Sequence, residues 1–295
     1  MIKFSTLFRC LHCLLAASLL HTACTTDDAE PQQQQELVVE GWVAEGQFPV
    51  VFVSTTIPIQ QRTTSLDSLE LFIAQWARVQ VDDGQDTVVL TGMRDSRYFP
   101  PYLFTTNRLR GKAGRTYHLT IDWHGQHAEA WTAIPPTVEV DSLWAQPSEG
   151  SDTLRDVCLR FHDNPDTRDH YLVFSRRTGE PQNPQLCVFG LVDDKVLAQP
   201  QDHTAAQTEV TIHVRRGGVL AESNYSSFYA RGDTVSVTLE HVDSITYAFW
   251  RAFEDNRQLS TTPFATAITP LTTNIHGGHG IWYGCGSASQ WLIID

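Results

Sequence analysis

The sequence predicts a mainly β protein, in which an immunoglobulin-like β-sandwich is followed by a second β-rich domain that carries one amphipathic helix. Three observations predict this fold class. From residue 37 onward, short stretches alternate apolar and polar side chains, which is the period-two pattern of half-buried strands. Gly, Pro, Asn and Asp separate these stretches, as turns between strands require. A single segment, 244–258, places its apolar residues at helical spacing instead.

Residues 1–23 have the features of a bacterial lipoprotein signal peptide. Lys3 and Arg9 supply a basic start, a mostly apolar run follows, and a small residue precedes Cys24, the expected lipid-attachment site. The apolar run is shorter than the roughly 20 residues that a membrane-spanning helix needs. His21 departs from the usual pattern, which has Leu at that place. Ordinary secretion with cleavage nearby is the alternative interpretation.

Residues 24–36 are expected to form a flexible tether, because they are acidic and glutamine-rich and offer almost nothing to bury. The whole chain has 21 Lys and Arg against 34 Asp and Glu, a formal net charge of -13. This excess of acidic residues argues against nucleic acid as a partner, since nucleic-acid binding needs clustered Lys and Arg side chains. The net negative charge also disfavours electrostatic binding to anionic membrane lipids. The acyl chains attached to Cys24 would then be the only membrane attachment.

The first predicted domain, 37–135, has the length of about 100 residues that an immunoglobulin-like unit needs. Its clearest strand is 116–123, in which Tyr117, Leu119 and Ile121 share one face. The consecutive prolines at 135–136 break the strand pattern and mark the domain boundary. The other strand-like runs are 37–43, 50–54, 78–81, 87–90 and 128–133.

The second predicted domain, 136–295, repeats the strand pattern and ends in a Gly-rich C-terminal segment. Its helix near 244–258 has Asp243 or Ser244 placed to cap its start and should pack on the second sheet. The predicted strands are 138–144, 154–161, 171–176, 186–192, 209–214, 234–240 and 290–294.

Three cysteines follow Cys24, namely Cys158, Cys187 and Cys285. An exported compartment permits disulfides, and a bridge from Cys158 to Cys187 across neighbouring strands is one option. Three thiols cannot all pair within one chain, so the sequence leaves the pairing open. Nothing near Cys285 indicates the lowered pKa that a nucleophile needs. We therefore expect no catalytic residues, no cofactor and no enzyme activity.

Two His-x-x-His pairs, His124 with His127 and His276 with His279, suggest zinc, and the oxygen ligands clustered in the segment 163–169 suggest calcium, although that segment lacks the EF-hand spacing. Zinc requires three or four converging ligands, and neither pair lies on a predicted helix or in a zinc-binding motif. We therefore expect no metal site and interpret these residues as turn and surface histidines.

The Gly-rich segment around residue 277 is the most distinctive part of the sequence. Its glycines permit positive φ and close backbone approach. The functional interpretation is a loop that contacts a partner or ligand, and the structural one is a tight path before the final strand. The residues of this candidate loop are Asn274, His276, Gly277, Gly278, His279 and Gly280.

Asp followed by Ser or Thr and then an aliphatic residue recurs along the chain. The pattern resembles the O-glycosylation acceptor of exported Bacteroidota proteins, although turns and helix caps also favour it. Ser244, at the start of the predicted helix, is best explained as a cap. The remaining candidates for glycosylation are Ser68, Thr87, Ser142, Thr153 and Thr234.

Several segments, in a consistent order, resemble the Bacteroidota outer-membrane lipoprotein family numbered four-two-four-nine in the domain-of-unknown-function series. They are 37–42, 77–84, 114–117, 133–135, 161–165, 170–171 and 273–281. Two positions depart from the family pattern: His170 stands where an aromatic is common, and Trp282 where Phe is usual. The resemblance implies an accessory subunit found beside TonB-dependent transporters, and it assigns no catalytic residue.

Together these features predict a non-enzymatic lipoprotein of the outer membrane, facing the cell exterior, that helps a TonB-dependent transporter capture a nutrient. The alternative is a stand-alone surface binding module or adhesin for a glycan or host protein. A sandwich fold does not choose between these functions, and the sequence does not name the cargo.

Overall fold

The computed structural model describes residues 35–57, 69–180, 182–183, 185–194, 209–217, 226–260 and 269–295. These residues belong to one compact unit, Gln35–Asp295. The predicted signal peptide, Cys24, most of the tether and Ser68 lie outside the described residues, and the predictions about them stay predictions. No helix in the described part of the chain is both long and apolar enough to cross a membrane.

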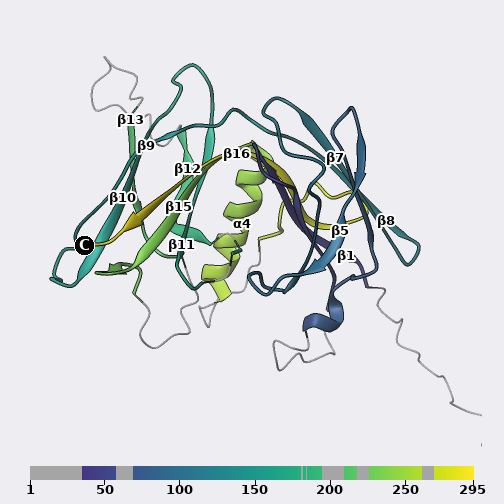
Figure 1. Cartoon of the computed structure of the whole chain (residues 1–295), viewed down its shortest axis with the longest axis horizontal. Helices are drawn as coiled ribbons and strands as arrows, with labels where there is room; N and C mark the ends of the chain where they lie inside the picture. The colour runs from purple at the N-terminus through teal and green to yellow at the C-terminus, as the bar shows by residue number, and fades with distance from the viewer. Residues whose placement is uncertain are drawn as a thin grey trace, which may run out of the picture. The chain divides into compact units, whose positions relative to one another are not determined.

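The protein is mainly β, as the alternating pattern predicts (Figure 1). Each strand predicted between residues 37 and 135 coincides with an observed one. The structure adds β5 and β6, which are too short to show a period-two pattern, and the 3-10 helix η2 (Glu70–Phe72). The strands of this part are β1 (Leu37–Ala44), β2 (Val50–Thr55), β3 (Arg78–Asp82), β4 (Thr87–Val89), β5 (Thr91–Arg94), β6 (Tyr102–Thr105), β7 (Thr116–Trp123) and β8 (Gln126–Ala133).

The remaining strands also follow the prediction, with two differences: the two-residue strand Tyr229–Ala230 was not predicted, and the last strand begins earlier than predicted. The last strand, β16 (Gly278–Ile293), begins at Gly278 and not at Gln290, so it includes part of the Gly-rich segment. The other elements are β9 (Val140–Pro147), β10 (Leu154–His162), β11 (His170–Arg177), β12 (Leu186–Asp193), β13 (Glu209–Val214), β14 (Tyr229–Ala230), β15 (Thr234–Val242) and α4 (Ser244–Ser260).

Strand β16 joins the two ends of the chain in one sheet of order β12-β11-β15-β16-β1-β2-β6-β5. Its first half runs parallel to β1, from Leu37↔Gly278 to Ala44↔Cys285, and its second half runs antiparallel to β15. In Figure 1 the yellow β16 accordingly runs beside both the purple β1 and the green β15. The predicted domains 37–135 and 136–295 therefore both contribute strands to this sheet. The immunoglobulin-like assignment of the first domain stays a prediction.

Two smaller sheets accompany the large one: β4-β3-β7-β8, and β13-β10-β14 with β9 paired to β10. Both faces of the large sheet are buried along β1 and β16. On β1, Val39 and Val43 belong to the core shared with β3, β7 and β8, whereas Trp42 belongs to a core on the opposite face. Trp282 and Tyr283 divide in the same way on β16. Burial on both faces explains the nearly continuous apolar run in β16.

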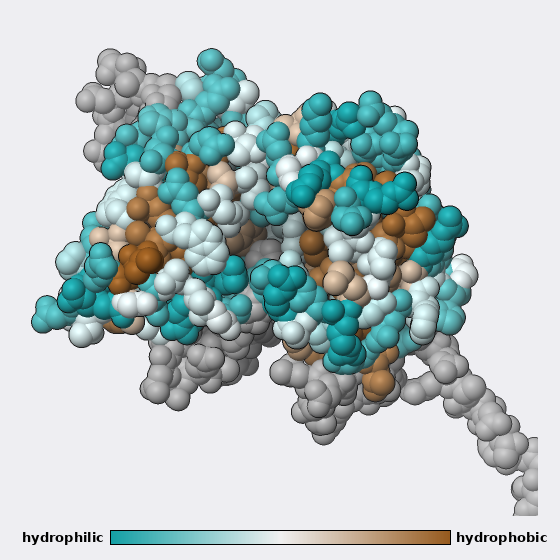
Figure 2. All heavy atoms as spheres, in the orientation of Figure 1, coloured by the Kyte–Doolittle hydropathy of each residue, from teal (hydrophilic) through white to brown (hydrophobic). Residues whose placement is uncertain are grey.

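Helix α4 covers part of that opposite face, where Phe249 and Trp250 join the core that contains Trp42. Its start is capped by Asp243, whose Oδ1 accepts a hydrogen bond from the Thr246 N–H at 2.7 Å. The predicted helix is thus confirmed, and Asp243 is its capping residue. The face shown in Figure 2 is mainly hydrophilic, and hydrophobic side chains gather on it in separate patches.

Candidate functional site

An open groove lies on the face of the large sheet that carries α4. It is next to the part of this face where Phe249 and Trp250 of α4 pack. Its volume is about 330 Å³, and side chains of β1, β11, β15 and β16 line it together with the loops near Tyr98 and Asn183. This volume lies at the lower end of the range for small-molecule sites. We call this cavity the groove.

Polar side chains in register form the floor of the groove. Alternate residues of a strand point to the same face, so Ser236, Thr238 and Glu240 of β15 lie side by side there. Thr238 pairs with Ser289 of β16, and their hydroxyl oxygens are 2.8 Å apart. A row of hydroxyl groups on a rigid sheet can donate and accept hydrogen bonds without a large ordering cost.

Aromatic rings border this polar floor. Trp291 is 57% exposed, and the Arg176 guanidinium carbon lies 5.4 Å from its ring centre. Trp42 and Tyr98, which also line the groove, both lie against Phe52, with ring centres 6.0 and 5.7 Å away. Exposed and partly buried rings of this kind provide flat apolar surfaces beside hydrogen-bonding groups.

Two loops hold the rim of the groove together. The side-chain amide of Asn183 donates to the Phe99 carbonyl oxygen at 2.7 Å and accepts from the Phe99 N–H at 2.6 Å. The Gln182 N–H donates to the Arg97 carbonyl oxygen at 2.6 Å. These bonds join segments that are far apart in the sequence and fix the rim of the groove.

Glu240 is the most unusual residue of the groove. Its side chain is buried, with 6% of the residue exposed, and its Oε2 has no hydrogen-bond partner among the described residues. Burial raises the pKa of Glu240 to about 7, against the opposing effect of the neighbouring Cys285 and Tyr283. The Tyr283 hydroxyl also has no partner within the described structure. The Tyr283 hydroxyl does not line the groove and interacts with Glu240 from the interior, so Glu240 alone marks a candidate ligand contact.

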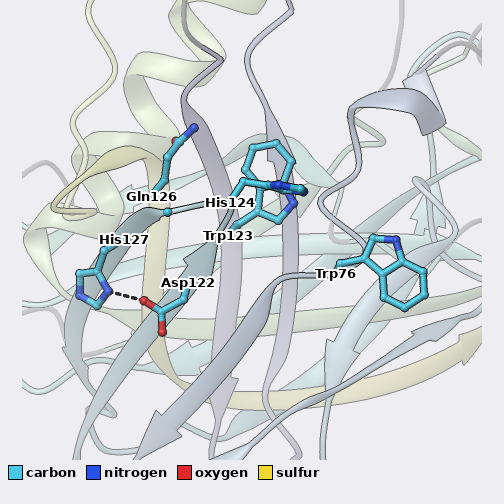
Figure 3. Close-up of a pocket in the computed structure, with 7 residues that line it drawn as sticks. Trp76, Asp122, Trp123, His124, Gln126 and His127 are labelled. Carbon is cyan, nitrogen blue, oxygen red and sulfur yellow. Dashed lines mark hydrogen bonds and ion pairs between the residues drawn. The ribbon is translucent and has the colours of Figure 1, made fainter.

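The first histidine pair does not form a metal site. His127 Nδ1 is 2.8 Å from Asp122 Oδ1, while His124, in a turn with φ of 46°, stands edge-on to Trp123. Figure 3 shows His127 turned to Asp122 and His124 beside Trp123, in a shallow pocket that also includes Trp76. Within the described residues, neither histidine pair belongs to a group of three converging ligands.

The Gly-rich segment leads directly into β16 and is held against the backbone of β1 and β8. Gly278 to Gly280 belong to β16, so the structural interpretation fits this part of the segment, and contact with a partner stays a prediction. The side-chain amide of Asn274 pairs with the backbone of Trp282 as the peptide group of a neighbouring strand would. It donates to the Trp282 carbonyl oxygen at 2.6 Å and accepts from the Trp282 N–H at 3.0 Å. The backbone of His276 exchanges two hydrogen bonds with Glu129 of β8, at 2.8 and 2.9 Å.

Close backbone contact explains the glycines of this segment. A Cβ at Gly277 would collide with the carbonyl oxygen of His127, and a Cβ at Gly278 would lie 2.7 Å from that of Leu37. The side chain of His279 instead faces outward, with Nε2 2.6 Å from Glu36 Oε2. The residues of the candidate loop thus fasten β16 to β1 and β8, and the structure does not bring them to the groove.

The cysteines Cys158, Cys187 and Cys285 are all free and buried, so the bridge between Cys158 and Cys187 is not formed. Burial raises the pKa of Cys187 to about 12, and burial also raises the pKa of Cys285 well above its usual value. Cys285 is on β16, and His279, the nearest histidine in the sequence, contacts Glu36 at the start of the same strand. This arrangement is the opposite of an activated thiolate.

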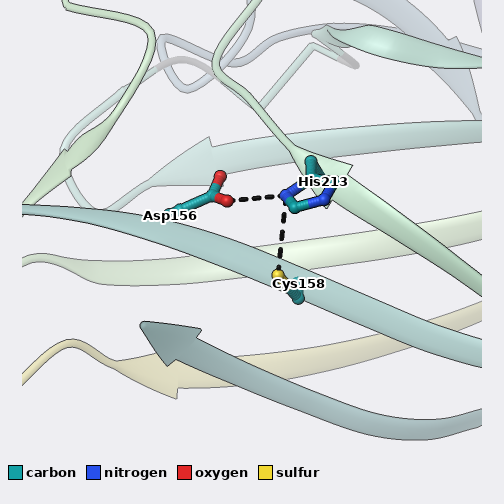
Figure 4. Close-up of side chains that lie close together, drawn as sticks. All are labelled: Asp156, Cys158 and His213. Carbon is teal, nitrogen blue, oxygen red and sulfur yellow. Dashed lines mark hydrogen bonds and ion pairs between the residues drawn. The ribbon is translucent and has the colours of Figure 1, made fainter. Parts of the chain in front are cut away.

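Cys158 lies beside a histidine and an aspartate that sequence spacing did not connect. His213 Nδ1 is 3.8 Å from Cys158 Sγ and 2.6 Å from Asp156 Oδ2 (Figure 4). In a catalytic triad the nucleophile and the acid contact different ring nitrogens, whereas here both contact the same one. Burial raises the pKa of Cys158 to about 11, so this thiol is not activated either.

The candidate glycosylation residues differ in accessibility. Thr87 and Thr153 are exposed, whereas Ser142 and Thr234 are partly buried within β9 and β15. The Thr87 hydroxyl donates to Asp82, which makes it part of a hairpin turn. Ser68 lies outside the described residues. Among the described candidates, Thr87 and Thr153 are therefore the exposed ones, and the Thr153 hydroxyl lies 3.4 Å from Ser151 Oγ.

A family model described as "Domain of unknown function (DUF4249)" matches residues 25–290. The match begins one residue after the cysteine predicted to carry the lipid and covers nearly all of the described chain. A search of the curated proteins finds no match.

Proposed function

Because the chain belongs to the DUF4249 family of unknown function, we propose its role from its own groove: the protein binds a small hydroxyl-rich nutrient at the outer membrane. In this proposal it is a non-enzymatic surface lipoprotein and an accessory subunit of a TonB-dependent transporter. The groove beside Glu240 is the observation that carries the proposal.

The chemistry of the groove favours a neutral saccharide or a similar polyol. Such a ligand donates hydroxyl hydrogens to the Glu240 carboxyl, which lines the groove, and it accepts hydrogen bonds from Arg176 and the serine hydroxyls. The apolar face of a sugar ring packs on an exposed ring such as Trp291. A strongly anionic ligand fits less well, because Glu240 lines the same groove.

A binding screen of the purified protein tests this proposal. We expect retention of neutral mono- or oligosaccharides on an array that also holds acidic saccharides and peptides. Ser289→Trp, which fills the groove, should abolish that binding, whereas Thr153→Trp adds the same bulk on an exposed turn and should not. Binding of peptides alone, or equal binding by the two variants, contradicts the proposal.

The cellular part of the proposal rests on the leader, the acidic tether and Cys24. Radioactive fatty acid should label the wild type and not Cys24→Ser. Purification from mild-detergent membranes should bring down an outer-membrane barrel of transporter size with the wild type. If the fatty-acid-labelled protein is purified without an outer-membrane barrel of transporter size, the accessory role is contradicted. The proposal that the groove binds a ligand is not affected by that result.

A second candidate, a stand-alone glycan or host-protein binder, is favoured by one surface feature. Trp131 of β8 is 47% exposed and stacks on His118 with ring centres 4.2 Å apart and nearly parallel planes. His276 stands edge-on to the same ring at 6.0 Å. If Trp131→Ala, and not a change in the groove, removes binding to glycans or cells, this second function replaces the first.

A further inference from the structure

Strands β10 and β13 bring three different metal-ligating side chains together. Cys158 lies directly opposite His213 in the antiparallel register, and Asp156 is two residues before Cys158, on the same face of β10. The carboxylate oxygen, the sulfur and the ring nitrogen all lie within 4.8 Å of one another. Figure 4 shows the Asp156 carboxylate and the Cys158 sulfur both directed at one nitrogen of His213.

The distances suit a common central ion better than any pairwise reaction. Tetrahedral zinc with bonds of about 2.0 to 2.3 Å keeps its ligand atoms roughly 3.3 to 3.8 Å apart. The separation of 3.8 Å between Cys158 Sγ and His213 Nδ1 already fits this geometry. The contact of 2.6 Å between His213 Nδ1 and Asp156 Oδ2 would open slightly as the ion replaces the shared proton.

The surroundings fix the ligands and leave a route to the solvent. Arg215 Nε is 3.2 Å from Asp156 Oδ1, so it orients the carboxylate and leaves Oδ2 for the ion. Asp156 and Cys158 are buried, while the side chain of His213 is half-exposed. His213 also lines a cavity of about 260 Å³, so the site is open to the solvent on the side of this histidine.

We propose that Asp156, Cys158 and His213 form a binding site for one thiophilic divalent cation of the zinc type, with a fourth position open to water or a small ligand. On binding, the Cys158 thiol proton is released to the solvent, and the proton that His213 Nδ1 shares with Asp156 leaves Nδ1 while Nε2 takes up a proton from the solvent. The ring proton of His213 resides on Nε2, since Nδ1 coordinates the ion. Hard cations such as calcium and magnesium are disfavoured, because they prefer oxygen ligands alone.

Titration with Co²⁺ tests the site directly, using the full-length protein without an oligohistidine tag. We expect one ion per chain, a thiolate-to-cobalt charge-transfer band, tetrahedral ligand-field bands, and displacement of Co²⁺ by Zn²⁺. Cys158→Ser should abolish the charge-transfer band, and His213→Gln should weaken Co²⁺ binding by at least about tenfold. His127→Gln, which removes an exposed histidine with a similar carboxylate partner, should change neither signal.

Circular dichroism of each variant shows whether it is folded, and His213→Gln should fold because its side chain is half-exposed. A charge-transfer band that persists in Cys158→Ser overturns the site, as does a loss of binding in His127→Gln alone. The absence of any cobalt band in the folded wild type at a large excess of Co²⁺ overturns it as well.

Discussion

Gly280 of β16 packs directly on the backbone of Val39 in β1, so closely that a Cβ at Gly280 would collide with the Val39 carbonyl oxygen. The backbone φ of Gly280 is 107°, a value that residues other than glycine rarely adopt. This contact lies where the two ends of the chain form a parallel pair.

Gly280→Ala should therefore lower the free energy of unfolding by more than about 2 kcal/mol, because collision and backbone strain act together. Denaturant unfolding measures the loss. Gly46→Ala is the matched control, since Gly46 also has a positive φ but has open space around it. It should cost only about 1 kcal/mol. Equal losses for both variants would show that the close contact does not matter.

Asn274→Ala should destabilise the protein by about 2 kcal/mol, because it removes the two hydrogen bonds that the Asn274 side chain makes to the backbone N–H and carbonyl oxygen of Trp282. His276→Ala is the control: its backbone pairs with Glu129, but its exposed side chain contributes only a ring contact to Trp131. Thermal unfolding of the two variants compares them. A larger loss for His276→Ala would contradict the structural role given to Asn274.

Glu240→Gln should stabilise the protein at high pH and have little effect at low pH. The pKa of this carboxyl is raised in the folded state from 4.5 to about 7, so the folded state binds more protons than the unfolded one between these values. Stability is therefore lost as the pH rises through this window. The difference of roughly 2.5 pH units corresponds to an upper limit of about 3 kcal/mol at pH 8.

Denaturant unfolding of the wild type and Glu240→Gln at pH 5 and pH 8 measures this effect. Asp122→Asn, which changes an exposed carboxyl, is the control and should show no comparable gain at pH 8. An advantage of Glu240→Gln that is larger at pH 5 than at pH 8 would contradict the raised pKa.

Cys158, Cys187 and Cys285 should resist alkylation in the native protein at pH 8, because each thiol is buried and has a raised pKa. After unfolding in denaturant without reductant, all three should react. Peptide mass spectrometry identifies each site. Protection that persists after unfolding would reveal a disulfide and contradict the free thiols.

The sequence predicted most strands and the helix because each has a local periodic pattern. The segment 116–123, for example, alternates so regularly that its bounds are those of β7. The start of β16 was missed, because Gly278 and Gly280 serve close backbone approach inside a strand, and glycine more often marks a turn. The short strands β5 and β6 have too few residues for a period to be visible.

Neither the groove nor the cysteine cluster could be predicted from spacing. Period two tells which residues of one strand share a face, but it does not tell which strands are neighbours. Arg176, Ser236 and Trp291 meet only because β11, β15 and β16 are adjacent. Likewise, Cys158 faces His213 through the register of β10 and β13. Such pairings are set by the whole fold.

Ligand binding in the groove is the central claim, and a calorimetric titration with a neutral saccharide identified on the array tests it most directly. Trp291→Ala should weaken binding about tenfold or more, because it removes the exposed ring beside Arg176. Trp131→Ala removes a similarly exposed ring outside the groove and should leave the affinity unchanged. Unchanged affinity in Trp291→Ala, together with a loss in Trp131→Ala, would contradict the claim.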